Sequence, residues 1–342
     1  MENGSAAARH DTRRPRRILG ALTVAVAALF AVAACGGGDS GGGGGSSASG
    51  KPTTLRVGVI PIADVAPLYV GIKQGFFKAE KLNIQPQLAE GGATITAQVV
   101  SGDLQVGFSN VTSLVIASSK KLPVQIVASG VQGAKDDSGA WDAVLSKKGS
   151  PIKDVKALEG KTVSVNNLNN VGPLTINQAM EKAGADYKKI KYVEVPFPDA
   201  NAALDTGRID AAFVVEPFVS QGKAQGANEV THSFEATAPN YTVATYFATK
   251  QYAGQNKDVL DRFVRAINKS LSYAQSHPDL VRQVVPTYTK IPAAVAKKMR
   301  LPTWSPNLNQ PSIQQTADLA QKYGFIKDKP DLGDLIRPAG GS

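Results

Sequence analysis

The sequence is poor in the side chains that carry most enzyme chemistry. Its 342 residues include one cysteine, Cys35, and three histidines, of which only His232 and His277 lie beyond the first 34 residues. One cysteine cannot form an internal disulfide, so the cores alone must stabilise the fold. Neither histidine has a neighbouring acid–thiol or acid–hydroxyl motif, and no Gly-x-Ser-x-Gly, phosphate-cradling or His-x-x-His motif is present. We therefore expect no catalytic residue, no metal site and no cofactor, and a protein that is not an enzyme.

Positive charge is in excess but is not concentrated. The formal net charge is +10, and five arginines against two acidic residues in the first 34 residues leave +7 on the rest. The lysines are scattered, and no stripe of Lys and Arg interleaved with aromatic residues is present. This pattern argues against nucleic-acid binding. Attraction to an anionic membrane surface is compatible with it.

The N-terminus has the pattern of an export signal. Arginines at 9–17 precede an apolar run at 18–34, which ends in small residues directly before Cys35. This pattern predicts a signal peptide over 1–34 and resembles the lipobox of bacterial lipoproteins, in which the new N-terminal cysteine carries lipid. A transmembrane anchor is the alternative, since 17 apolar residues reach the short limit of a span. The Arg16-Arg17 pair also leaves twin-arginine export open.

Residues 35–53 predict a tether. The stretch 36–50 is almost wholly Gly, Ser and Ala. It cannot bury apolar surface and has a reach of roughly 20 Å as a flexible coil. Together with a lipidated Cys35, it predicts a folded body held at the extracytoplasmic face of the cell membrane.

The folded body contains an internal repeat. The segment 102–108 (GDLQVGF) returns as 207–213 (GRIDAAF), 105 positions later, and the strand-like 55–60 maps onto 160–165 within one residue. A period of this length is the size of a domain. Two similar lobes leave a cleft between them, where small ligands commonly bind.

Strand-like and helix-like segments alternate along both copies, which predicts an α/β fold with parallel sheets and helices on both faces. The expected strands are 54–60, 83–88, 105–108, 124–129, 162–165, 191–195, 210–215 and 241–249. The expected helices are 67–81, 93–101, 111–118 (with Asn110 as N-cap), 171–183, 199–206, 258–275, 278–285, 292–299 and 312–323.

The domain boundaries follow from these elements. We expect lobe 1 at 54–142, lobe 2 at 143–240, and a return to lobe 1 with C-terminal helices at 241–342. Crossings near 141–146 and 239–246 would form a two-stranded hinge.

Ligand-binding candidates lie in the loops that follow the strands. There, helix N-termini present free N–H groups, and ligands sit beyond the carboxyl ends of parallel strands. These loops contain no Lys or Arg, so an anion would be held by amides and hydroxyls. Capping and turn formation are the alternative role of each residue. The expected ligand-binding residues are Asp64, Ala66, Tyr69, Gly92, Ser109, Asn110, Asn166, Asn167, Asn170, Asp199, Glu216 and Tyr246.

Glu216 is the most specific of these candidates. It ends an apolar strand directly before Pro217. Its carboxylate could accept hydrogen bonds from an amine or amidine, or it could pair with a lysine or cap the next turn. Tyr69, Phe197, Phe218, Trp141 and Tyr246 could form pocket walls or belong to the core.

Several segments together resemble the substrate-binding proteins of ABC importers in the SsuA/THI5-like (NMT1-like) group. The resemblance covers about residues 54–250. Its motifs are Pro67-Leu68-Tyr69-Val70, Gly75-Phe76-Phe77, Gly91-Gly92-Ala93, 101–107 (SGDLQVG), 158–163 (LEGKTV), 207–211 (GRIDA) and Glu216-Pro217. It implies a type II periplasmic-binding-protein fold that closes over a ligand.

The resemblance also implies function and partners. We expect a monomeric solute-binding protein that delivers a small organic solute, sulfonate- or taurine-like or pyrimidine-like, to an ABC permease and its ATPase. The Asn-rich run 166–170 departs from the loop expected of a sulfonate binder and suits a neutral or zwitterionic ligand. A ligand-presenting sensor, or a pyrimidine-synthesis enzyme of the THI5 type, are the alternatives.

Overall fold

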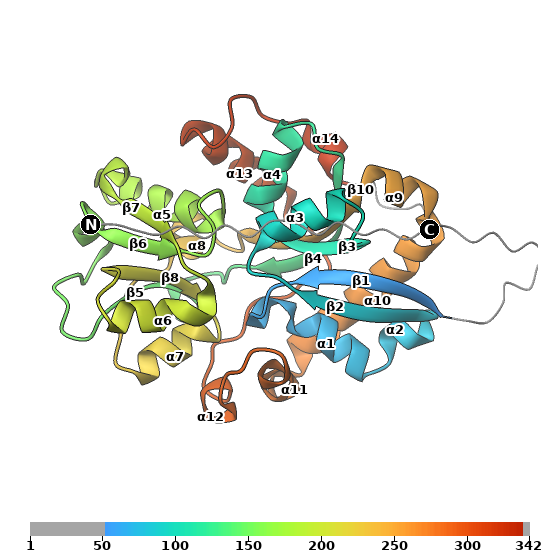
Figure 1. Cartoon of the computed structure of the whole chain (residues 1–342), viewed down its shortest axis with the longest axis horizontal. Coiled ribbons are helices and arrows are strands. Elements are labelled where there is room, and N and C mark those ends of the chain that lie inside the picture. The colour runs from blue at the N-terminus through green and yellow to red at the C-terminus, as the bar shows by residue number, and fades with distance from the viewer. Residues whose placement is uncertain (1–51, 338–342) are drawn as a thin grey trace, which may run out of the picture. The chain divides into compact units, whose positions relative to one another are not determined.

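The computed structural model describes residues 52–337, which form two five-stranded sheets surrounded by helices (Figure 1). The predicted signal peptide and Cys35 lie outside these residues, as does most of the predicted tether. None of the helices within 52–337 is both long and apolar enough to span a bilayer.

The first sheet has the order β2-β1-β3-β10-β4. Its strands are β1 (Thr53–Val59), β2 (Leu82–Leu88), β3 (Val106–Asn110), β4 (Val124–Gln132) and β10 (Thr242–Thr249). β1 pairs in parallel with β2 and β3, whereas β10 is antiparallel to both β3 and β4.

The second sheet has the corresponding order β7-β6-β8-β5-β9. Its strands are β5 (Asp142–Ser146), β6 (Thr162–Val165), β7 (Lys191–Glu194), β8 (Ala211–Val215) and β9 (Asn228–Thr231). β6 is parallel to β7 and β8, and β5 is antiparallel to β8 and β9. The two copies of the repeat thus form β3 and β8, at the same place in each sheet.

The prediction of parallel sheets is wrong in one respect, because both sheets are mixed. The antiparallel strand is β10 in the first sheet and β5 in the second. Each is the first strand that the chain forms after it leaves the other sheet, since β5 follows β4 and β10 follows β9. A strand that arrives from the other lobe is not preceded by a crossover helix of its own lobe, so nothing forces it to run parallel.

Helices cover each sheet. Those with the first sheet are α1 (Ala66–Lys73), α2 (Phe76–Ala79), α3 (Gly92–Val100), α4 (Val111–Ser119), α9 (Lys250–Gln255), α10 (Lys257–Ser276), α11 (Pro278–Val284), α12 (Ala293–Ala296), α13 (Gln310–Lys322) and α14 (Leu332–Leu335). Those with the second are α5 (Val171–Lys182), α6 (Phe197–Asp205), α7 (Phe218–Ala224) and α8 (Ser233–Thr237).

Two predicted helices are shorter than expected. The helix over 67–81 is interrupted by Gly75, whose φ of 73° ends α1 before α2 begins. This left-handed conformation suits glycine because it has no Cβ. Only Ala293–Ala296 is helical within the predicted 292–299. β9, α8, α9 and α14 were not predicted. The predicted cap is confirmed: the Asn110 side chain accepts a hydrogen bond from the backbone N–H of Ser113.

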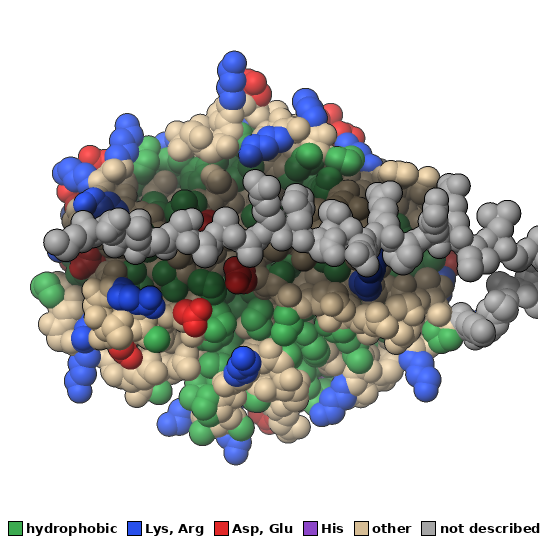
Figure 2. Space-filling view, in the orientation of Figure 1, with side chains coloured by type: hydrophobic (Ala, Val, Ile, Leu, Met, Phe, Trp, Pro, Cys, Tyr) green, Lys and Arg blue, Asp and Glu red, His purple; other side chains and the backbone are tan. Residues whose placement is uncertain are grey.

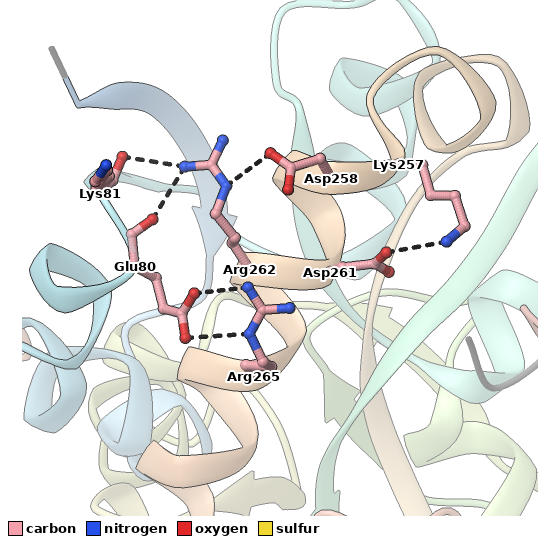
Figure 3. A network of polar contacts seen from close by, with 7 residues as sticks. All are labelled: Glu80, Lys81, Lys257, Asp258, Asp261, Arg262 and Arg265. Atoms are coloured by element: carbon pink, nitrogen blue, oxygen red, sulfur yellow. Dashed lines mark hydrogen bonds and ion pairs between the residues drawn. The ribbon is translucent and has the colours of Figure 1, made fainter. Parts of the chain in front are cut away.

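The long C-terminal helix α10 packs against α1, α2 and β4, in the first lobe. Figure 3 shows the polar network at this contact. Arg262 donates to the backbone carbonyls of Glu80 and Lys81 and to the Asp258 carboxylate, while Arg265 forms a bidentate pair with Glu80. Because Arg262 satisfies two carbonyls of the turn after α2, it holds that turn against α10.

Candidate functional site

An inner cavity lies beyond the carboxyl ends of strands from both lobes, with β1 and β3 on one side and β8 on the other. Its volume is about 30 Å³. That space is far below the roughly 300–1,000 Å³ of typical ligand pockets, so an organic solute requires the lobes to part or the walls to move. Its polar lining consists of Asp64, Asn110, Asn166 and Asn170. Its other lining residues are Ile60, Ile62, Phe108, Val171, Phe197, Phe213, Val215, Phe234, Val243 and Ala244.

Two of the three asparagines that line the cavity also cap helices. Asn110 caps α4, and Asn170 caps α5 by accepting from the backbone N–H of Val171. Asn170 also donates to Asn166 Oδ1 at 3.2 Å. The N-termini of α4 and α5 therefore both lie at this cavity, with their backbone N–H groups and positive dipole ends.

Asp64 is the ionisable residue of the cavity lining. It belongs to the 3-10 helix Ala63–Val65 that follows β1, and its side chain is only 3% exposed. Its Oδ1 has no hydrogen-bond partner among the described residues. Burial raises the pKa of the Asp64 carboxyl to about 8, against the lowering effect of a hydrogen bond from its own backbone N–H. The backbone is held in place by Trp304, whose Nε1 donates to Asp64 O at 2.9 Å.

Four phenylalanines supply most of the apolar surface of the cavity. Phe213 packs edge-on against Phe234, with ring centroids 5.8 Å apart, and lies 6.2 Å from Phe197. Phe108 contributes from the other lobe. Because every one of these rings is buried, the cavity walls have a low dielectric constant, which strengthens any electrostatic interaction made inside.

A larger outer pocket of about 450 Å³ opens at the surface between the lobes. Its lining residues are Pro61, Leu88, Pro198, Asp199, Phe218, Gln221, Tyr288, Thr289, Lys290 and Ile291. An adjoining pocket of about 380 Å³ shares Ile60 and Phe197 with the inner cavity. Figure 2 shows hydrophobic side chains gathered on this face, where α6 and α7 approach α12. The shared residues thus place the adjoining pocket next to the inner cavity.

Three tyrosines lie close to Asp64. Tyr69 stacks on Tyr288 with ring centroids 4.0 Å apart, and the Tyr288 hydroxyl donates to Ile62 O at 3.0 Å. The Tyr246 hydroxyl is buried and has no partner among the described residues. Burial raises the pKa of Tyr246 and of Tyr288, and the nearby Tyr69 and Asp64 raise both further.

Glu216 is buried but does not line the inner cavity. Its carboxylate accepts from Ser220 N at 3.0 Å, Ser220 Oγ at 2.8 Å and Arg300 N at 3.0 Å. Burial raises the pKa of Glu216 to about 7, although these hydrogen bonds lower it. Its contacts in this structure are therefore those of a cap on α7 and a tie to the chain after α12.

The remaining predicted residues lie around the cavity. Ser109 and Asn110 lie so close to Gly92 that a Cβ there would be 2.3 Å from Ser109 Oγ. Asn167 approaches Gly91 from the other lobe, and its Oδ1 has no partner within the described chain. Ala66 begins α1 behind Asp64.

Of the twelve predicted residues, four line the inner cavity, and Asp199 lines the outer pocket. Among the predicted aromatic walls, Phe197 lines the cavity and Phe218 the outer pocket, whereas Trp141 is buried and donates to Gln132 O at 3.0 Å. Tyr288 and Trp304 were missed. They come from a segment more than 200 residues beyond β1, and no sequence motif marks them.

The lobes are tied directly to each other. Ala63 N donates to Glu216 O at 2.9 Å, and Ser113 Oγ donates to Asn169 O at 3.2 Å. The Tyr323 hydroxyl donates to Gln178 Oε1 at 2.6 Å. Ion pairs of Arg300 with Glu229 and of Lys322 with Glu181 join the lobes as well. No group of three or more His, Cys, Asp or Glu side chains within 52–337 is placed to hold a metal ion.

A family model described as NMT1/THI5 like matches residues 62–280, more than half of the chain. The chain belongs to this family. The crystal structure of the periplasmic aliphatic sulphonate binding protein SsuA from Escherichia coli superposes with a TM-score of 0.68 at 20% identity, covering 85% of this chain and 94% of that one. The two-lobed α/β fold predicted for a periplasmic binding protein is thereby confirmed.

Curated relatives are mostly binding proteins. The formylaminopyrimidine-binding protein of Halalkalibacterium halodurans is 25% identical over 64% of this chain, and the taurine-binding periplasmic protein of Escherichia coli is 24% identical over 66%. One is an enzyme, the 4-amino-5-hydroxymethyl-2-methylpyrimidine phosphate synthase of Aspergillus parasiticus, at 19% over 62%. The chain spans just under two thirds of these relatives, namely 65%, 66% and 64% of their lengths.

Proposed function

We propose that this chain is the extracytoplasmic solute-binding protein of an ABC importer, which captures a small organic solute between its lobes and delivers it to a membrane permease. The observation that carries the proposal is the site itself, because one cavity takes its polar groups from both lobes. A solute bound there contacts both halves at once. Its binding energy then shifts an equilibrium between open and closed lobes.

The solute is a sulfonate- or taurine-like or a pyrimidine-like compound, in keeping with the names of the relatives. The pockets suit a solute with a flat apolar part and a few hydrogen-bonding groups. Four phenylalanines and three asparagines can provide those contacts. The partners are a permease and its ATPase, and the binding protein acts as a monomer.

The proposed anchor is a lipid on Cys35, after removal of residues 1–34, with the Gly/Ser-rich tether holding the protein at the outer face of the cell membrane. Cys35→Ser should release the protein into the soluble fraction without changing its thermal unfolding. Persistent membrane association of that variant contradicts lipidation and favours a spanning signal anchor.

Synthesis of a pyrimidine is the second candidate, because one relative is a synthase. The positions of the histidines argue against it. His232 Nδ1 contacts Asp142 O, and His277 stacks on Tyr273 at the surface, so neither lines the cavity. A sensor that presents its ligand to a membrane receptor would use the same site, and uptake measurements distinguish it from a transporter.

The test is a thermal-shift screen followed by calorimetry on the mature chain. Taurine, alkanesulfonates, nitrate, hydroxymethylpyrimidine and aromatic acids form the panel. A true ligand at a hundredfold excess over its Kd stabilises the protein by about 2.7 kcal/mol. Turnover of a panel compound would favour the enzyme, and the absence of any stabilising solute would contradict the binding role.

A further inference from the structure

The inner cavity has one acidic group and no basic partner for it. Among the described residues that line the cavity, Asp64 is the one that can ionise. Lys290 lines the outer pockets, together with Asp199, and does not line the inner cavity. A ligand in the inner cavity therefore meets a carboxyl group that no Lys or Arg of the lining neutralises.

The Asp64 carboxyl is not used by the fold. It caps no helix through its side chain, and Oδ1 is buried without a hydrogen-bond partner. An unsatisfied buried carboxyl oxygen costs stability, so it needs a reason to be there. The other polar residues of the cavity differ in this respect, because Asn110 and Asn170 satisfy their helix N-termini.

The surroundings of Asp64 suit a positively charged nitrogen. The cavity is lined by phenylalanine rings, which can pack on a flat group and attract a cation through their π-faces. Amide oxygens of the asparagines can accept further N–H bonds. An anion would instead add negative charge beside a carboxylate in a low-dielectric site.

From this geometry, and resting on the proposed function, we propose that the solute carries a cationic nitrogen group, a protonated amine or an amidinium on a flat ring, and that Asp64 is the residue that recognises it. The ligand donates one hydrogen bond to Oδ1 and places its ring among the phenylalanines. Asp64 thus selects against sulfonates and nitrate at this position.

The titration of Asp64 gives a signature of this role. Burial holds the pKa of the free carboxyl at about 8, so it is mostly protonated at pH 7. A cation needs the carboxylate, so its binding releases a proton, and its affinity rises with pH until Asp64 is ionised. An anion held by the protonated carboxyl would show the opposite dependence.

The experiment uses three probes with one ring and three head-group charges: benzamidine, benzamide and benzenesulfonate. Their affinities for the mature chain are measured by calorimetry at pH 6, 7, 8 and 9. We expect benzamidine to bind most tightly, to gain up to tenfold in affinity per pH unit below 8, and to level off above that value. Asp64→Asn should weaken benzamidine by about 10- to 100-fold and flatten its pH profile.

Asp328→Asn is the matched control, because Asp328 is exposed and distant in sequence from every lining residue. It should leave all three affinities unchanged. The apo melting temperature of Asp64→Asn should equal or exceed that of the wild type, which separates loss of binding from loss of folding.

Three results would overturn the inference. These are tighter binding of benzenesulfonate than of benzamidine, an unchanged benzamidine affinity in Asp64→Asn, or no binding of any probe. None of them removes the solute-binding function, because the solute panel above tests that function separately. Conversely, benzamidine binding that leaves every panel solute inactive would retain the cation site and contradict the proposed solutes.

Discussion

At the scale of single residues, the polar atoms that the fold leaves unsatisfied are informative. Asp64 Oδ1 and Tyr246 Oη are both buried and lack partners among the described residues, and Asp64 also lines the inner cavity. A fold selected for stability alone would satisfy or replace such groups. The unsatisfied oxygen of Asp64 therefore supports the location of the site independently of the cavity volume.

Tyr246→Phe should leave stability unchanged or raise it slightly, since the change removes a buried hydroxyl that has no partner. Tyr241→Phe is the matched control, because the Tyr241 hydroxyl hydrogen-bonds Thr316 Oγ1 at 2.6 Å. The control should lose about 1 kcal/mol in urea unfolding. An equal loss in both variants would mean that Tyr246 has a partner in solution.

A buried carboxyl pair predicts a pH dependence of stability. Asp142 accepts from Ser233 N and Oγ, and Glu235 accepts from Ala134 N. The second oxygen of each carboxyl is buried without a hydrogen-bond donor among the described residues. Burial and the adjacent Glu235 raise the pKa of Asp142 well above its usual range. The native state therefore holds this proton at pH values where the unfolded chain has lost it.

The sign follows from linkage. Because the native state binds more protons above about pH 4, this group makes the free energy of unfolding fall as pH rises, until Asp142 itself ionises. Asp142→Asn removes that dependence. The free energy of unfolding of this variant, relative to that of the wild type, should therefore increase from pH 5 to pH 8. Urea unfolding at both pH values measures this, and Asp328→Asn should show no such gain. An equal effect of Asp142→Asn at both pH values would contradict a raised pKa.

At the scale of elements, local sequence determined most strands and helices, and contacts determined their ends. Alternating and continuous apolar runs located β1, β3 and β8 within one or two residues. The break at Gly75 was missed, because the periodicity of α1 continues through it. Gly75 ends α1 through its left-handed backbone, and Arg262 and Arg265 then hold the turn after α2 against α10. That contact joins segments about 180 residues apart.

Gly71→Ala tests the packing of α1 on α10. A Cβ at Gly71 would lie 2.0 Å from Ser270 Oγ and 2.8 Å from Phe77 Cε2. The helices must separate or Ser270 must move, so we expect a loss of about 1–3 kcal/mol in unfolding free energy. Gly254→Ala in α9 is the control, because no atom lies within 4 Å of its added Cβ. That control should gain about 0.5–1 kcal/mol, and a neutral Gly71→Ala would show that the contact is loose.

At the scale of the whole folded unit, function depends on how the two lobes meet. Backbone and side-chain bonds such as Ala63 N to Glu216 O join them around the cavity. Close approach at Gly91 belongs to the same contact. Its φ of −174° is accessible to any residue, so space alone requires glycine there.

Gly91→Ala should shift the equilibrium toward separated lobes, because its Cβ would lie 2.0 Å from Asn167 Oδ1 in the other lobe. Spin labels at Lys121 and Lys188, which are surface sites in different lobes, should report a longer distance between the lobes. The ligand affinity of the variant, measured by calorimetry, should fall by about two- to tenfold. Gly254→Ala should change neither. An unchanged distance in Gly91→Ala would mean that Asn167 moves aside at little cost.

The sequence by itself determined the α/β class, the two-lobed repeat, the family resemblance and four polar residues of the cavity, because strand ends and helix caps are local features of the chain. It did not show that Glu216 bonds to Ser220 and Arg300, that β5 and β10 enter antiparallel, or that Tyr288 and Trp304 support the Asp64 region. Those facts were decided only in the tertiary structure. The burial and the hydrogen-bond partners of a side chain depend on segments up to 240 residues apart. They leave the Glu216 carboxylate bonded to Ser220 and Arg300, and Asp64 Oδ1 without a donor among the described residues.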